Sequence, residues 1–197
     1  MILDPTVIPA SDRSILVQFG DEISEDLHHQ GFLFTQGLLA SSHQVISNIS
    51  PGYSSVLVRL HPKATMAEGM DTIAEILKEE HPGNTNPQRT VEIPVCYEDD
   101  FGPDLGRVLK HTGYDKEELI ERHALGRYLV YFLGFSAGFP YIGGMDESLA
   151  TPRLKTPRKA VPAGSVGIAG QQTGIYPLST PGGWNLIGRT PLPLFNR

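Results

Sequence analysis

Residues Tyr128–Leu133 read YLVYFL, and the stretch that follows, residues 134–145, reads GFSAGFPYIGGM. The apolar run predicts a buried β-strand, because aromatic and β-branched side chains favour strands. Beyond it, glycine and proline divide the sequence into many short segments as far as residue 190. Such a pattern is typical of a β-barrel or β-sandwich with long loops, so the second half of the chain predicts a mostly-β domain.

Two short helices are expected between residue 103 and this strand. In the second helix, Asp115 and Glu118 have the spacing of a capping box, and the helix is expected to end at His123. A histidine near the negative end of a helix dipole is favoured in its charged form. That is a structural explanation for His123, beside which a functional one stays open.

The first hundred residues predict the order strand, helix, strand, strand, helix, strand. The expected strands cover residues 15–19, 45–49, 55–60 and 90–95, and the expected helices cover residues 23–39 and 66–77. This is the order of the ferredoxin-like α+β fold, in which both helices cover one face of an antiparallel sheet. A change of composition marks a linker, so we expect a ferredoxin-like domain at 1–96, a linker at 97–103 and the β domain at 104–197.

Composition restricts the class of protein. The chain has 197 residues, a net charge of −6 and 40% hydrophobic residues, which favours a folded protein and gives no general attraction to nucleic acid. The single cysteine, Cys96, allows no intrachain disulfide and is expected as a small buried side chain. No basic, apolar leader opens the sequence and no apolar run reaches the ~20 residues that cross a bilayer, so we expect a cytoplasmic protein.

Residues 152–159 form a cationic segment. Four positive side chains stand there on a backbone stiffened by Pro152 and Pro157. Rigidly presented arginine and lysine can clamp a carboxylate or phosphate, and a solvated charged loop is the equal alternative. No metal site is expected, because the histidines lack the spacing of a zinc-binding helix.

Residues 161–190 are rich in glycine, which lets backbone N–H groups approach a ligand. Neither a P-loop nor a Rossmann glycine motif is present. Ser165 lacks the Gly-x-Ser-x-Gly elbow of a nucleophile and is expected to be a hydrogen-bonding turn residue.

Several motifs in a fixed order resemble one known family. They are Gly134-Phe135-x-x-Gly138-Phe139-x-Tyr141, Pro152-Arg153, Pro157-Arg158, Val161–Val166, Ile175-Tyr176-Pro177 and Pro181-Gly182-Gly183-Trp184-x-Leu186–Thr190. The family is that of the 5-oxoprolinase B subunit, also called allophanate hydrolase subunit 1 or the KipI-like family. The resemblance covers nearly the whole chain.

The resemblance implies a cyclophilin-like β-barrel from about residue 102 onward. It also implies a heteromeric enzyme with a homologous C subunit and a separate A subunit, which together open the lactam of 5-oxo-L-proline to L-glutamate. ATP, with Mg²⁺, would drive the reaction and could bind at a shared interface between subunits. The chain alone is expected to be inactive.

Residue chemistry and motif position then give candidate site residues. As catalytic residues we expect His123, as an acid–base group, and Arg158. As substrate-binding residues we expect three groups. The cations that meet anionic groups are Arg153, Lys155 and Arg189. The aromatic walls are Phe135, Phe139, Tyr141 and Tyr176. The residues that orient the substrate are Ser165, Gln171 and Thr190.

Two departures from the family pattern accompany the resemblance. Ser136-Ala137 and Pro140 stand where other residues are expected, and the barrel's last strands are expected beyond Arg197, which would leave an open sheet edge. The alternative function is a KipI-like inhibitor whose pocket holds a segment of a sensor histidine kinase. Prolyl isomerisation is a weaker third hypothesis that rests on fold analogy alone.

Overall fold

The computed structural model describes residues 4–41, 44–79 and 89–195, which form two compact units. Unit 1 comprises residues 1–89 and unit 2 comprises residues 90–197. None of the described helices is long and apolar enough to span a membrane. Each unit has an antiparallel sheet and a core of its own.

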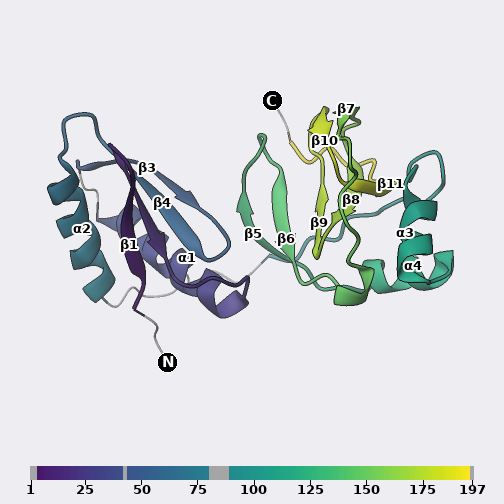
Figure 1. Ribbon diagram of the computed structural model, residues 1–197, viewed down its shortest axis with the longest axis horizontal. Helices are drawn as coiled ribbons and strands as arrows, with labels where there is room; N and C mark the ends of the chain where they lie inside the picture. The colour runs from purple at the N-terminus through teal and green to yellow at the C-terminus, as the bar shows by residue number, and fades with distance from the viewer. Residues whose placement is uncertain (1–3, 42–43, 80–88, 196–197) are drawn as a thin grey trace. The chain divides into compact units, whose positions relative to one another are not determined.

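Unit 1 is a four-stranded antiparallel sheet with two helices (Figure 1). The strands lie in the order β1-β2-β4-β3. Their bounds, with those of the helices, are β1 Thr6–Ser11, β2 Ser14–Gln18, α1 Glu25–Ala40, β3 Ile46–Pro51, β4 Ser55–Leu60 and α2 Met66–Lys78.

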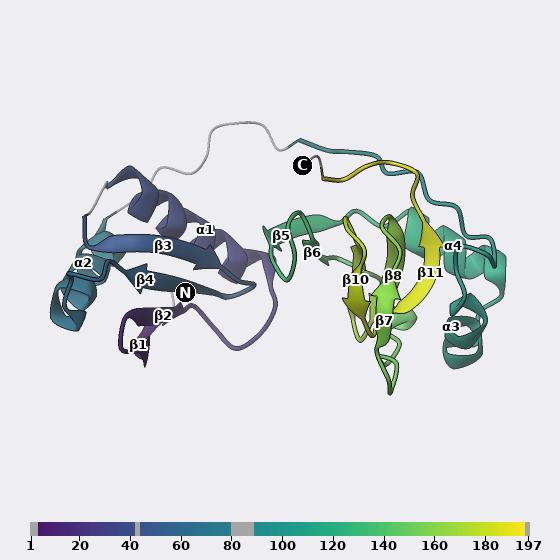
Figure 2. The same cartoon turned by 90° about the horizontal axis from the view of Figure 1, so that it is seen from above.

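Alternation along the strands explains this architecture. In β4, Val56, Val58 and Leu60 are buried while Leu57 and Arg59 are exposed, so one face of the sheet is apolar. The buried strand residues share one core cluster with the buried residues of both helices, and α1 lies against β3 and β4 (Figure 2). Both helices therefore cover the same face, and the opposite face of the sheet is open.

Both helices of unit 1 begin directly after a residue whose side chain caps the first turn. Ser24 caps α1 by accepting a hydrogen bond from the Leu27 N–H. Thr65 and Glu68 form a reciprocal capping box at the start of α2. Such contacts satisfy N–H groups that the first helical turn leaves free.

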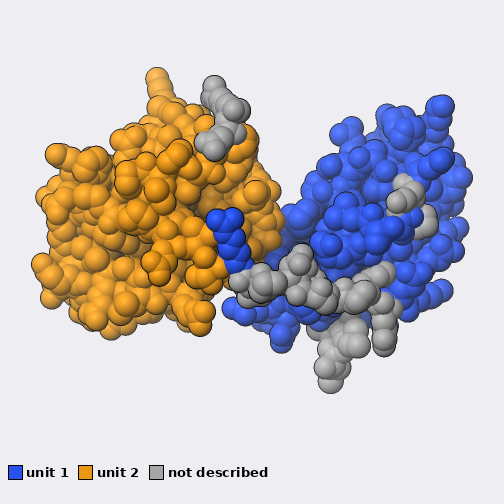
Figure 3. Space-filling view, turned by 180° about the vertical axis from the view of Figure 1, so that it is seen from behind, with its two compact units in different colours: residues 1–89 blue, residues 90–197 orange. Residues whose placement is uncertain are grey.

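The predicted strand at residues 90–95 is wrong. The sheet edge that it was expected to take is occupied instead by β1, which forms a hairpin with β2. Residues 90–95 are not a strand, and Ile93 and Val95 pack against the core of unit 2. The compact units accordingly divide at residues 89 and 90 rather than within 97–103 (Figure 3).

Cys96 was expected to be buried and is exposed. Its backbone pairs with that of Arg189 in unit 2, while its side chain lies outside the core. The prediction rested on the apolar residues beside Cys96 in the sequence. Two of these, Ile93 and Val95, pack on the core of unit 2, whereas residues 1–96 had been predicted to belong to the first domain.

Unit 2 begins with the two expected helices. They are α3 Leu105–Thr112 and α4 Lys116–Ala124, and Asp115 caps α4 by accepting a hydrogen bond from the Glu118 N–H. Residues Glu147–Leu149 form a short 3₁₀ turn, η1. α3 lies against β11, at the opposite end of the sheet from β5 (Figure 1).

The rest of unit 2 is β-structure, as the sequence predicted. A five-stranded antiparallel sheet has the order β11-β8-β9-β6-β5, and β10 pairs with β7 in a separate two-stranded sheet. The strands are β5 Leu129–Leu133, β6 Pro140–Gly143, β7 Arg158–Val161, β8 Ser165–Ala169, β9 Gln172–Ile175, β10 Thr180–Gly182 and β11 Asn185–Arg189. The mixed α/β architecture is confirmed, whereas a cyclophilin-like barrel stays a prediction.

Strand β5 differs from its prediction in burial. It was expected to be a buried strand, but it is the edge strand of its sheet, and the Leu133 side chain is 64% exposed. The strand that is buried throughout its length is β8, which lies between β11 and β9.

Candidate functional site

A pocket opens on unit 2 among the loops around β6, β7 and β10. Its volume is about 270 Å³. The residues that line it are Phe135, Phe139, Tyr141, Arg153, Pro157, Tyr176, Pro181, Gly182, Gly183 and Trp184. It is therefore an aromatic pocket with one cationic side chain.

Phe139 is the centre of the aromatic wall. Its ring is 2% exposed and lies 5.3 Å from the rings of Tyr141 and Tyr176, centroid to centroid. The rings of Phe135 and Trp184 lie 5.4 and 5.6 Å from it, and all four partners meet it edge to face. Aromatic pairs prefer this geometry because the ring edge is positive and the face is negative. The cluster forms a rigid apolar surface.

Phe135 presents an exposed ring from a strained backbone. Its φ is 59°, the only positive value at a described residue other than glycine, and the residue is 64% exposed. A bulky residue in the left-handed region is energetically unfavourable and is typical of functional loops. Gly138, with φ of 76°, allows the same short loop to turn back into β6.

Tyr176 closes the base of the pocket. Burial raises the pKa of its hydroxyl, and this outweighs a backbone hydrogen bond at Trp184 and the positive charges of Arg153 and Arg158. A Cβ atom on Gly182 would collide with the Tyr176 hydroxyl oxygen, so this position requires glycine. The phenol therefore stays neutral near pH 7 and lies within electrostatic reach of two arginines.

Arg153 is held at the rim by the backbone on both sides of it. The carbonyl of Pro152 accepts hydrogen bonds from Arg107 Nη1 at 3.1 Å and from Asn185 Nδ2 at 3.0 Å. The N–H of Leu154 donates to the Gly183 carbonyl at 2.8 Å. Within the described chain the Arg153 guanidinium itself has no hydrogen bond or ion pair, which leaves it available to an anion.

Arg158, which was predicted to be catalytic, follows the lining residue Pro157 in the sequence but does not itself line the pocket. Its Nη2 donates to Asp104 Oδ1 at 2.7 Å, and Asp104 Oδ2 accepts the Leu186 N–H at 2.7 Å. This pair ties β7 to the start of α3 and to β11. Since the Asp104 carboxylate is nearly buried, both of its oxygens need these donors.

Three buried polar atoms of the described chain have no hydrogen-bond partner within it. They are Ser136 Oγ, Arg158 Nη1 and Thr180 Oγ1. Each residue directly adjoins, in the sequence, a residue that lines the pocket. None of these three residues lines the pocket itself, but all of them lie in the segments that form it.

Comparison with known proteins gives the family. Residues 5–197 match the family model for the carboxyltransferase domain, subdomain C and D. The chain is 42% identical to the 5-oxoprolinase B subunit of Bacillus subtilis, over 93% of this chain and 81% of that protein. The chain belongs to the 5-oxoprolinase B-subunit family.

Two further comparisons extend this result. The 5-oxoprolinase B subunit of Escherichia coli O157:H7 is 47% identical over 74% of this chain and 67% of that protein. The crystal structure of TTHA0988 superposes with a TM-score of 0.80 at 33% identity, covering 91% of this chain. This chain corresponds to 35% of the longer TTHA0988 chain.

The pocket brings together five of the residues that the sequence predicted to bind substrate. They are Phe135, Phe139, Tyr141, Arg153 and Tyr176. The structure places these residues in one pocket, and their contacts with a ligand stay a prediction.

The other predicted binding residues do not line the pocket. Lys155 and Gln171 are exposed outside it. Both Ser165, the first residue of β8, and Thr190, which follows β11, are buried; the Ser165 carbonyl accepts the Tyr176 N–H and the Thr190 N–H donates to the Gly164 carbonyl. Arg189 Nε donates to the Ala163 carbonyl at 2.8 Å. A ligand-binding role for these residues stays a prediction.

His123 is a buried histidine that does not line the pocket. Its Nδ1 lies 2.8 Å from the Tyr97 hydroxyl and its Nε2 lies 2.9 Å from Thr173 Oγ1. Burial lowers the pKa of His123 to about 4, so the expectation of a charged imidazole is wrong. The desolvation cost exceeds the benefit from the helix end.

The hydrogen bonds also fix the tautomer of this imidazole. The Thr173 hydroxyl donates its one proton to the Gly167 carbonyl, so Thr173 Oγ1 accepts from His123 Nε2–H. Nδ1 then accepts from the Tyr97 hydroxyl, whose pKa burial raises. Both ring nitrogens of a neutral imidazole are thereby satisfied.

The sequence prediction missed the pocket residues between β9 and β11. The motif Pro181-Gly182-Gly183-Trp184 was recognised as a family motif without a site role. Its signal was available, because two adjacent glycines beside a tryptophan allow a backbone to approach an aromatic ring closely. The backbone of Gly182 does so at Tyr176, and the Trp184 ring meets the Tyr176 ring edge to face.

Proposed function

We propose that this chain is the B subunit of an ATP-dependent 5-oxoprolinase that acts with the A and C subunits in the cytoplasm. The overall reaction converts 5-oxo-L-proline, ATP and water to L-glutamate, ADP and phosphate. Membership of the 5-oxoprolinase B-subunit family supports the reaction class. The chain's own contribution is argued from the pocket of unit 2.

The observation that carries the proposal is the combination of an aromatic wall with the guanidinium of Arg153 in one pocket. Ligand pockets are commonly 300–1,000 Å³, so a pocket of about 270 Å³ suits a ligand of amino-acid size. 5-Oxoproline is a small planar lactam with one carboxylate. Its ring fits against Phe139 and Trp184, and its carboxylate fits the guanidinium of Arg153.

The three unpartnered atoms belong to segments that adjoin the pocket lining in the sequence. In the proposal these segments rearrange when the lactam binds, so that Arg158 Nη1 donates to the ring carbonyl and the hydroxyl of Ser136 or Thr180 accepts from the ring N–H. In this role Arg158 polarises the carbonyl while Asp104 positions its guanidinium. The catalytic role predicted for Arg158 is thus retained in the proposal, and that of His123 is not.

ATP makes the chemistry possible because an amide carbonyl is a poor electrophile. When the lactam oxygen attacks the γ-phosphorus, ADP leaves, the ring nitrogen gives up its proton and an O-phosphorylated imidate forms. One water then adds to the carbon and the ring C–N bond breaks, which leaves an acyl phosphate and a free amine. A second water hydrolyses the acyl phosphate to the carboxylate and phosphate. Among the described residues there is no group of three His, Cys, Asp or Glu that could hold a metal ion. In the proposal Mg²⁺ and ATP are held by another subunit or at an interface with one, and the chain's residues bind and orient the lactam.

The proposal is tested by reconstitution. The purified chain is combined with the A and C subunits of the same source, and 5-oxoproline-dependent release of phosphate from ATP is measured together with glutamate formation. We expect turnover that requires every component. Turnover by the A and C subunits without this chain, or no turnover from a complex that assembles, would contradict the proposal.

No observation on the described residues favours the alternative of a histidine-kinase inhibitor. Neither of the two curated relatives named above carries that name. The rigid, small pocket also suits a ring better than an extended peptide segment.

A further inference from the structure

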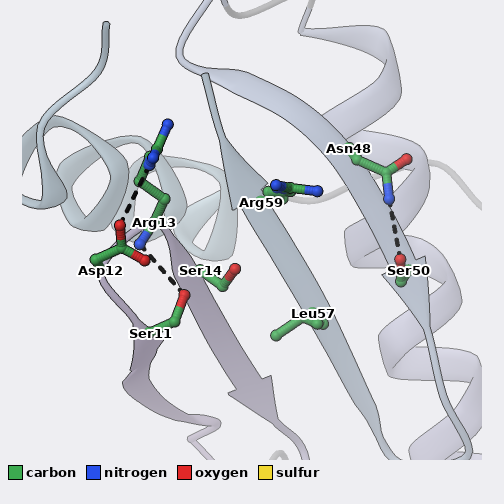
Figure 4. Close-up of a pocket in the computed structure, with 8 residues that line it drawn as sticks. All are labelled: Ser11, Asp12, Arg13, Ser14, Asn48, Ser50, Leu57 and Arg59. Atoms are coloured by element: carbon green, nitrogen blue, oxygen red, sulfur yellow. Dashed lines mark hydrogen bonds and ion pairs between the residues drawn. The ribbon is translucent and has the colours of Figure 1, made fainter. Parts of the chain in front are cut away.

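A second concave surface lies on unit 1, on the open face of its sheet. We call it the strand groove, and its volume is about 310 Å³. The residues that line it are Ser11, Asp12, Arg13, Ser14, Asn48, Ser50, Leu57 and Arg59 (Figure 4). We propose that the strand groove binds an oxyanion, a phosphate or a carboxylate, through Arg59 and the hydroxyl groups around it.

The register of the sheet places these side chains in one row. Ser14 pairs with Arg59, and Arg59 pairs with Asn48 on the other side. Residues directly opposite in neighbouring strands point to the same face and lie close together. The helices cover the other face, so the row is open to solvent.

Arg59 is free to bind. Its backbone carbonyl accepts a bond from Ser47, but its guanidinium has no hydrogen bond or ion pair within the described chain. Figure 4 shows it between Ser14 and Asn48. A guanidinium offers five N–H donors in a fork that matches two oxygens of a carboxylate or phosphate.

The neighbouring hydroxyl groups also have protons to donate. Ser11 Oγ accepts the Arg13 N–H, and Ser50 Oγ accepts from Asn48 Nδ2, so each keeps its own proton for another acceptor. The only carboxylate in the groove, Asp12, bonds Arg13 Nε at 3.3 Å. Donors therefore outnumber acceptors, which selects an anionic ligand.

The distribution of charge in unit 1 supports the same choice. Residues 1–89 include eleven acidic and five basic side chains, and two of the five basic ones, Arg13 and Arg59, lie in the strand groove. An otherwise acidic unit thus concentrates positive charge at one hollow. This inference goes beyond the proposed function, because the groove belongs to unit 1 and the aromatic pocket to unit 2.

The test is a titration of the ¹⁵N-labelled full chain with inorganic phosphate at constant ionic strength, followed by amide chemical shifts. We expect saturable shifts at Ser14, Asn48 and Arg59 with a Kd of about 1–10 mM. Arg59→Gln should weaken binding roughly tenfold or more, because a charged hydrogen bond is lost. Arg89→Gln, at an exposed arginine outside the groove, should leave it unchanged.

Parallel titrations with succinate and with a tetraglutamate peptide distinguish the source of the oxyanion. Saturation by phosphate or succinate identifies a small-molecule ligand, whereas saturation by the peptide alone identifies acidic side chains of a polypeptide. Arg59→Lys, which keeps the charge and loses the fork, should bind with intermediate affinity. The proposal is overturned if none of the three probes saturates, or if Arg59→Gln and Arg89→Gln behave alike.

Discussion

The stability of unit 2 should fall when the pH is lowered from 7 to 5, because of His123. Its pKa is about 4 in the folded protein, compared with about 6.5 for an exposed histidine. Between these values the unfolded state binds more protons than the folded state, so the free energy of unfolding decreases as the pH falls. The loss develops as the pH falls through 6.5 and levels off below pH 4.

The magnitude follows from the two pKa values. Between pH 7 and pH 5 the linkage removes about 2 kcal/mol from the free energy of unfolding. The structural cause is burial of the imidazole, which disfavours its charged form, and a second ring proton would also meet the Tyr97 hydroxyl, which already donates to Nδ1. Charging His123 thus also costs a hydrogen bond.

The assay is urea unfolding followed by the fluorescence of Trp184, the only tryptophan and a buried residue of unit 2. His123→Gln should be less stable at pH 7 and should lose most of the pH dependence, whereas His111→Gln, at an exposed histidine of α3, should keep it. Equal pH slopes for the wild-type protein and His123→Gln would refute the reasoning.

Three further predictions concern stability. Phe139→Ala should lower the free energy of unfolding of unit 2 by about 3–5 kcal/mol, whereas Phe135→Ala, at the exposed ring, should cost under about 1 kcal/mol; urea unfolding of both variants checks this contrast. Asp104→Asn should lower the free energy of unfolding by about 2–3 kcal/mol, because it weakens the ion pair with Arg158. A double-mutant cycle with Arg158→Gln should show coupling between the two positions, and additive losses would contradict the pair. Thr65→Ala should lower the stability of unit 1 by about 1 kcal/mol in circular dichroism melts while the Trp184 transition stays in place.

Local patterns predicted most of the elements. The alternation in β4 and the capping residues of α2 and α4 depend on neighbours in the sequence, so these elements lie close to their expected places. Strand β1 was missed, although its pairing with β2 is local, because Pro9 interrupts its apolar pattern. The sequence alone did not show which sheet edge it would take.

The failures share a physical cause, which is packing between distant residues. Whether residues 90–95 pair with unit 1 or pack on unit 2 depends on which core accepts Ile93 and Val95. The exposure of Cys96 follows from the same choice. The charge of His123 depends on its surroundings at Tyr97 and Thr173, which lie 26 and 50 residues away in the sequence.

The candidate site was predictable in part for the same reason. Aromatic residues in a glycine-rich loop, such as Phe135 and Phe139, indicate a pocket wall, and the structure gathers them. Among the predicted cations, Arg153 is the one that lines the pocket, since hydrogen bonds at the Pro152 carbonyl and the Leu154 N–H fix the backbone on both sides of it. No local sequence pattern distinguishes Arg153 from Lys155.

The central claim is that the aromatic pocket of unit 2 binds the lactam through Arg153, and one measurement tests it most directly. In the reconstituted enzyme, the rate of ATP hydrolysis is measured against 5-oxoproline concentration for wild-type chain, Arg153→Gln and the control Arg127→Gln, an exposed arginine outside the pocket. We predict that Arg153→Gln raises the KM for 5-oxoproline roughly tenfold or more, as loss of a charged hydrogen bond requires, while Arg127→Gln matches the wild type. An unchanged KM in Arg153→Gln, with the complex intact, would contradict the claim.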